Sequence, residues 1–256
     1  MSSISKNPYK WLNVVLFIAT LVVNALSTLL PLGGRDTREI SDMYKNLLTP
    51  AGFAFSIWSV IYLLLIGFVI YAFVAERKGR TTAAAPGPLF AISCVLNMAW
   101  LFCWQYLLLE LSVVVMILFL ITLILIYVRT RLNGQRTEVA DILFVKVPFS
   151  IYLGWVSVAT IVNISALLTK YDFNGFGLGT AFWAIVMIVV ASLLAFTIGF
   201  RFRDGLYPLV FAWALYAISV EQSDASQVVS TTALVASIVV AVFSVWMFIR
   251  SIMDRD

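Results

Sequence analysis

The amino-acid sequence predicts an all-α integral membrane protein that crosses the bilayer eight times. Hydrophobic residues make up 62% of the 256 residues and charged residues 12%, against roughly half and a quarter in soluble domains. The hydrophobic residues also fall into blocks about 20 residues long, the length that a helix needs to cross roughly 30 Å of hydrocarbon. A transmembrane β-barrel would need segments of about ten residues that alternate polar and apolar side chains, and the sequence lacks them.

The predicted spans follow one another with loops of unequal length. They lie at 11–30, 52–75, 89–109, 111–128, 142–168, 179–200, 206–220 and 228–249. The first block is longer than the apolar core of a signal peptide, about 7–15 residues, so we interpret it as a retained helix. The second block follows the longest polar stretch of the chain, residues 31–49, and ends at a basic run. The third and fourth blocks meet at Glu110, which predicts two antiparallel neighbouring helices.

The last four blocks differ in how well they fit a bilayer. The fifth follows the polar loop 129–141, and the eighth precedes a charged tail at 250–256. Only the seventh block, 206–220, is short for a span. The sequence therefore predicts eight helices, with the seventh as the weakest member of the set.

Lys and Arg are distributed unevenly between the two sides of an eight-span arrangement. The side that holds both termini carries Lys6, Lys10, Arg77, Lys78, Arg80, Arg129, Arg131, Arg136, Arg201, Arg203, Arg250 and Arg255. The opposite side carries Arg35, Arg38, Lys45 and Lys170. Because basic loops stay in the cytoplasm, both termini are predicted to be cytoplasmic.

Several classes of function are disfavoured by composition. The net charge is only +4 and the basic residues are spread over loops, which does not favour nucleic-acid binding. The chain has no histidine, the commonest general base, metal ligand and haem ligand. No span holds paired carboxylates, a metal cluster or a nucleophile next to a base. We therefore expect no catalytic residues, no metal site and no resident cofactor.

Polar and aromatic side chains inside the predicted spans gather on helix faces. A lone amide in a span usually makes an interhelical hydrogen bond worth about 0.6 kcal/mol. Here the residues recur at helical spacing: Trp58 with Tyr62, Asn97 with Trp100 and Trp104, and Trp155 with Asn163. Three such faces predict a mostly apolar cavity with a few polar groups, as in small-molecule sites.

These motifs resemble the TspO/MBR family, the translocator or tryptophan-rich sensory proteins. Residues 48–62, with the sequence LTPAGFAFSIWSVIY, resemble the signature of the family's second helix. Residues 96–100 resemble its Leu-Asn-x-x-Trp motif in the third helix, and Trp155 and Asn163 repeat the spacing of the fifth. The resemblance covers roughly residues 11–170.

The sequence departs from the family pattern at several places. Phe53 stands where the family usually has Trp, Val115 or Met116 stands where the fourth helix often has Asp, and Pro148 is farther from Trp155 than usual. Helices six to eight have no counterpart in a five-helix protein. We therefore expect an extended, divergent member, with a five-helix TspO-like bundle at 1–170 and three additional helices at 171–256.

The resemblance implies a membrane sensor or binding protein for a hydrophobic ligand such as a porphyrin or a sterol-like lipid. The implied site residues are Trp58, Tyr62, Asn97, Trp100, Trp155 and Asn163, with Arg35 and Arg38 on a lid formed by 31–49. It also implies contact with membrane lipids, a homodimer and, if the source is bacterial, the plasma membrane. The alternatives are a small-molecule or lipid transporter and, as a side activity of the family, porphyrin breakdown.

Overall fold

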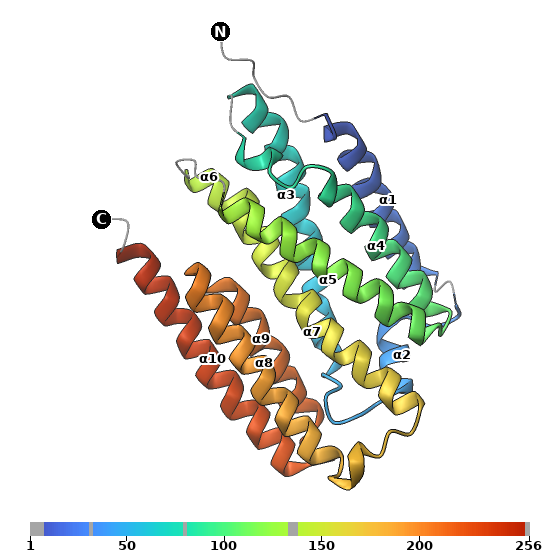
Figure 1. Cartoon of the computed structure of the whole chain (residues 1–256). Coiled ribbons are helices and arrows are strands. Elements are labelled where there is room, and N and C mark those ends of the chain that lie inside the picture. Colours follow the sequence, from blue (N-terminus) through green and yellow to red (C-terminus); the bar gives the residue numbers. More distant parts are fainter. Residues whose placement is uncertain (1–7, 31–32, 79–80, 133–137, 254–256) are drawn as a thin grey trace. The chain divides into compact units, whose positions relative to one another are not determined.

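The computed structural model describes residues 8–30, 33–78, 81–132 and 138–253, and all regular elements in these ranges are helices (Figure 1). Some residues used above lie outside the described ranges: Lys6, Pro31, Leu32, Arg80, Arg136, Arg255 and Asp256.

Seven helical runs of the described chain are long and apolar enough to cross a membrane. Their main helices are α1 Lys10–Leu29, α3 Ile57–Arg77, α4 Pro88–Gln105, α5 Leu109–Arg131, α7 Val147–Lys170, α8 Thr180–Phe202 and α10 Gln227–Met253. The remaining expected span is α9, Leu206–Glu221, whose 16 residues extend about 24 Å at 1.5 Å per residue. Seven spans, rather than eight, therefore meet the length criterion.

Short helices and single helical turns lie between the long helices or lead into them. The helix α2, Thr37–Met43, lies in the polar stretch between the first two spans. A 3-10 turn, η1 Gly52–Ser56, leads into α3, and another, η2 Thr82–Ala84, precedes α4. The helix α6, Val139–Asp141, and a π-helical turn, η3 Ile142–Lys146, lead into α7. A last 3-10 turn, η4 Gly175–Gly177, precedes α8.

The joint between α4 and α5 differs from the expectation. Glu110 is not the joint but lies in the first turn of α5, where a negative charge is favourable at the positive end of the helix dipole. The reversal is made instead by residues 106–108, and Leu107 adopts a left-handed backbone conformation with φ of 59°. The predicted turn was therefore misplaced by a few residues.

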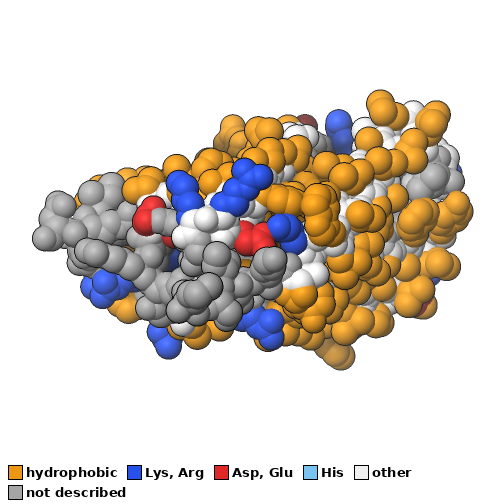
Figure 2. Space-filling model, turned by 90° about the horizontal axis from the view of Figure 1, so that it is seen from above, with side chains coloured by type: hydrophobic (Ala, Val, Ile, Leu, Met, Phe, Trp, Pro, Cys, Tyr) orange, Lys and Arg blue, Asp and Glu red, His pale blue; other side chains and the backbone are white. Residues whose placement is uncertain are grey.

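The outward faces of the long helices are apolar. Large apolar side chains that are at least half exposed recur at helical spacing on α1 and α10: Trp11, Val15, Ile18 and Val22, and Val228, Val235, Val242 and Ile249. Figure 2 shows hydrophobic side chains over much of the described surface in that view, with fewer Lys and Arg side chains at several separate places. Such faces suit a hydrocarbon solvent, and the protein is an integral, multi-pass membrane protein.

The chain forms two compact units that interleave in sequence. The first contains residues 1–37 and 57–153, and the second contains residues 38–56 and 154–256. In the first unit α4 packs against both α1 and α5. In the second unit α8, α9 and α10 pack against one another (Figure 1). A division into domains at residue 170 remains a prediction from the sequence.

Helix α9 is the centre of the second unit. Ten of its 16 residues are buried, and the hydroxyl of Ser237 on α10 donates to the Ala212 carbonyl at 2.8 Å. The Tyr207 hydroxyl lies 3.2 Å from Ser157 Oγ on α7. Because protein covers most of this helix, its packing does not require the full length of a lipid-facing span.

Candidate functional site

Four of the sequence-predicted site residues come together in the first unit, on α3 and α4. Asn97 is fully buried on α4, and its side-chain oxygen accepts a hydrogen bond from Asn24 Nδ2 on α1 at 2.8 Å. Tyr62 on α3 donates its hydroxyl proton to Asn24 Oδ1 at 2.7 Å. The two amides and the phenol thus tie three helices together at one point.

Asn97 also has a partner on α7. Its Nδ2 donates to the hydroxyl oxygens of Tyr62 and Tyr152, each at 3.4 Å. Tyr152 is buried, and its ring meets Phe119 of α5 edge to face. Buried amides and phenols in a bilayer need partners because no water is available to them. The polar network therefore joins α1, α3, α4 and α7, and the ring of Tyr152 adds an apolar contact with α5.

Aromatic rings stack beside this network in a column of four. Trp58 lies between Tyr62 and Trp100, with ring centroids 5.7 and 5.9 Å apart and planes inclined by 17° and 28°. Trp100 stacks in turn on Trp104, at 6.1 Å and 25°. These are offset-stacked geometries of the kind that aromatic rings prefer. We call these four residues the aromatic column.

The column arises from the helical spacing of its residues. Trp58 and Tyr62 are four residues apart on α3, and Trp100 and Trp104 are four apart on α4, so each pair lies on one helix face. At the far end, Trp104 Nε1 donates to the carbonyl of Thr37 at 3.1 Å. The column thereby also fixes the chain where α2 begins.

The other predicted site residues are distributed differently. Trp155 and Asn163 lie on α7 in the second unit, and both are buried. The ring of Trp155 meets Phe55 edge to face at 6.1 Å. Arg35 is exposed in the first unit, and Arg38 is exposed on α2 in the second, 3.8 Å from Asp42. The site roles of these four residues stay predictions.

The sequence-based set omitted two residues of the network, Asn24 and Tyr152. Asn24 is an amide within the first span, and Tyr152 precedes Trp155 by one helical turn. Both signals were visible as polar groups in apolar blocks. Asn24 lies on α1 and Tyr152 on α7, far from Asn97 of α4 in the sequence. Only the fold shows that they contact Asn97, because the sequence does not tell which helices are neighbours.

The site offers binding surfaces rather than reactive groups. Its described side chains are indole, phenol and amide groups, none of which carries a charge at neutral pH. Flat rings favour stacking with a flat apolar molecule, and the amides can exchange their mutual hydrogen bonds for those of a ligand. Among the described residues, no three of His, Cys, Asp or Glu cluster as metal ligands.

The fold defines a multi-pass helical membrane protein, and its first unit contains a cluster of aromatic and amide side chains. A family model described as TSPO-like protein matches residues 10–246, so the chain belongs to the TSPO-like family. Proteins of this family are in general membrane binding proteins without enzymatic activity. The match extends through α8, α9 and most of α10. No curated protein and no solved structure matches the chain.

Proposed function

We propose that this protein binds a hydrophobic ligand, such as a porphyrin or a sterol-like lipid, at the aromatic column and amide network of the first unit. The observation that supports the proposal best is the stack of Tyr62, Trp58, Trp100 and Trp104 next to the buried Asn97. When a flat tetrapyrrole binds, the aromatic rings of the column would stack on the ligand instead of on one another. Polar substituents of the ligand would replace some of the hydrogen bonds that the amides and phenols make with each other.

The residues present favour a particular charge and metal content of the proposed ligand. Porphyrin carboxylates would need basic partners, and we propose Arg35 and Arg38 for this role, as basic residues of the segment between the first two spans. The chain has no histidine, so an axial bond from imidazole to haem iron is excluded. Metal-free porphyrin is therefore the favoured tetrapyrrole.

The proposal includes a topology. We propose that α9 forms an eighth span, that both termini are cytoplasmic, and that a bacterial chain of this kind resides in the plasma membrane as a homodimer. The excess of Lys and Arg in loops on the side of the termini supports the orientation and the eighth span.

The test is quenching of tryptophan fluorescence by protoporphyrin IX in nanodiscs, with empty nanodiscs correcting for porphyrin dissolved in lipid. Trp58→Phe and Trp100→Phe should weaken binding roughly three- to tenfold, the equivalent of one aromatic stacking contact. Trp246→Phe, which alters an exposed ring on α10, serves as the control. Equal affinity in all three variants would contradict the proposal.

A transporter remains the second hypothesis. It predicts that proteoliposomes accumulate porphyrin when a proton or sodium gradient is imposed. A binding protein predicts equilibration without dependence on a gradient, so the same vesicles separate the two functions.

A further inference from the structure

The segment between α2 and α3 lies along one face of α9 within the second unit. Its contacts with that helix occur at Trp213, Ala217 and Glu221, which are four residues apart and therefore share a face. The order is antiparallel: the chain meets Glu221 first and Trp213 last. We call residues 45–54 the strap.

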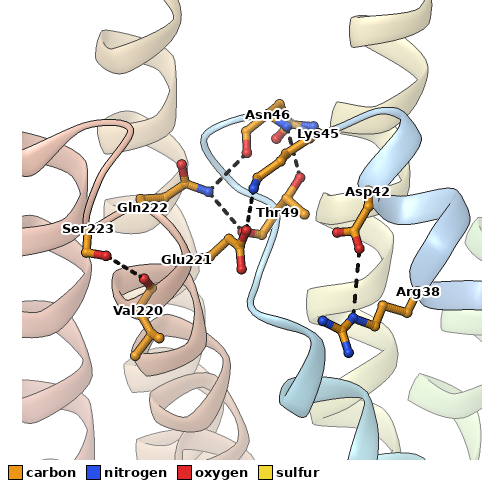
Figure 3. Close-up of polar contacts among 9 residues, drawn as sticks. All are labelled: Arg38, Asp42, Lys45, Asn46, Thr49, Val220, Glu221, Gln222 and Ser223. Atoms are coloured by element: carbon orange, nitrogen blue, oxygen red, sulfur yellow. Dashed lines mark hydrogen bonds and ion pairs between the residues drawn. The ribbon is translucent and has the colours of Figure 1, made fainter.

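The first half of the strap is held by polar contacts that Figure 3 shows. Lys45 Nζ pairs with Glu221 Oε1 at 2.5 Å. Gln222 Nε2 donates to the carbonyls of Asn46 and Thr49, at 3.2 and 3.0 Å. Gln222 is buried, whereas the Lys45 side chain is half exposed. We call Lys45, Glu221 and Gln222 the latch.

The second half of the strap is held by backbone and apolar contacts. The Ala51 amide donates to the Ala217 carbonyl at 3.0 Å, an approach that the small side chain of Ala217 permits. Trp213 Nε1 donates to the carbonyl of Ala54 at 3.3 Å, and its ring meets Phe53 edge to face at 5.2 Å. The two halves therefore differ in kind: polar and partly exposed at Lys45, apolar at Phe53.

The charge of Glu221 is explained by this arrangement. It is the last residue of α9, where the negative end of the helix dipole disfavours a carboxylate. Lys45 supplies the compensating charge, and in turn the hydrogen bond and the charge of Glu221 raise the pKa of Lys45 above its ordinary value. The negative charge of Glu221 at the end of α9 is thus matched by the positive charge of Lys45 on the strap.

Asn46 connects the strap to a further helix of the same unit. Its side-chain oxygen accepts from Ser165 Oγ at 3.2 Å and its Nδ2 donates to Thr169 Oγ1 at 3.3 Å, both on α7. The same oxygen accepts from the Leu48 amide at 2.9 Å. The strap is therefore bound on two sides, and its fixed conformation depends on helices that follow it by more than a hundred residues.

We propose that α9 acts as a built-in clamp that holds the strap against its own face. When the contacts of the latch are broken, the strap detaches from α9, beginning at the Lys45 end. This assigns the carboxy-terminal helices a role in controlling the loop between the first two spans, which the ligand-binding proposal does not require.

The test is hydrogen exchange of the full chain in nanodiscs, followed by mass spectrometry of peptides covering the strap, without any ligand. Gln222→Met keeps the length of the side chain but removes both donors, and it should speed exchange in residues 46–51 by roughly tenfold or more. Lys45→Met, at a half-exposed position, should act in the same direction with a smaller factor. Peptides from α8 and α10 should exchange as in the wild type.

Ser223→Ala is the matched control, because that hydroxyl is exposed and bonds within its own turn to the Val220 carbonyl (Figure 3). The proposal is overturned if strap exchange is unchanged in both latch variants, or if it rises equally in α10, which would indicate general destabilisation. Porphyrin binding is measured separately, so failure of the ligand proposal leaves this result intact.

Discussion

Asn97 shows how one side chain organises the first unit. It is fully buried, and its amide contacts residues of α1, α3 and α7. In water such a group would lose and regain similar hydrogen bonds on folding. In a bilayer a lost partner is not replaced by water, so removing Asn97 leaves Asn24 with an unsatisfied donor.

We expect Asn97→Ala to destabilise the protein by about 1–3 kcal/mol, the cost of leaving a buried polar group without its partner. The measurement is thermal or denaturant unfolding in detergent micelles. A double-mutant cycle with Asn24→Ala should give a coupling of about 0.6–2 kcal/mol. Thr197→Ala, an exposed hydroxyl bonded within its own helix, should change little. Strictly additive effects of the two Asn substitutions would refute a direct interaction.

The ion pair of Lys45 with Glu221 stabilises the strap at neutral pH, and this stabilisation is lost at alkaline pH. Glu221 raises the pKa of Lys45 above the ordinary value of 10.5, first through the hydrogen bond and then through charge attraction. A raised folded-state pKa means that the stabilisation is complete below 10.5 and is lost as the pH rises through the raised value. Because the Lys45 side chain is half exposed, the effect is at most about 1 kcal/mol.

The corresponding experiment is a series of melting temperatures from neutral pH to pH values above 10.5. Wild type should lose stability more steeply at the alkaline end than Lys45→Met. Lys45→Arg should resist the loss, because the guanidinium group keeps its charge. Parallel curves for wild type and Lys45→Met would show that the pair does not contribute.

At the scale of elements, the packing of α8, α9 and α10 depends on close approach at glycine. A Cβ on Gly199 of α8 would lie 2.7 Å from Pro208 Cγ of α9 and 2.8 Å from Phe243 Cε1 of α10. Neither ring can move far in a packed interior. The three helices can therefore meet only because this position has no side chain.

This contact reverses the usual sign of a glycine substitution. In an open helix Gly→Ala stabilises by about 1 kcal/mol, because alanine has the better helix propensity. We expect Gly199→Ala instead to destabilise by about 1–3 kcal/mol through overpacking. Unfolding curves decide between the two signs, and a stabilised variant would show that α9 and α10 lie farther from Gly199 than the structure places them.

At the scale of the whole molecule, the number of spans decides on which side of the membrane the carboxyl terminus lies. Seven runs meet the length expected of a span, and α9 is shorter. Its burial among α7, α8 and α10 gives it protein rather than lipid as its main surroundings. The charge asymmetry of the loops favours a crossing by α9, as proposed above.

A reporter fused after Asp256 should therefore be active in the cytoplasm, and one inserted after Ser223 should be active on the opposite side. These two reporters lie on either side of α10 in the sequence. A third reporter, inserted after Arg203, should be active in the cytoplasm. If the reporters after Arg203 and Ser223 fall on the same side, α9 does not cross and the eight-span proposal fails.

The sequence was sufficient for features that depend on local composition. Block length and hydropathy predicted the long helices, and the spacing of Trp58, Tyr62, Asn97 and Trp100 predicted a shared face on α3 and on α4. Family membership followed from the same motifs, and the match over residues 10–246 confirms it. The start of α5 was misplaced because Glu110 is as favourable in a first helical turn as in a loop.

What the sequence determined by itself is that the chain is a helical membrane protein of the TSPO-like family with an aromatic and amide face in its early helices. Only the tertiary structure decided that Asn24 and Tyr152 complete the network, and that residues 45–54 bind α9. These are contacts between residues from 38 to more than 170 positions apart. Helical periodicity assigns a residue to a face, but packing alone determines which faces meet.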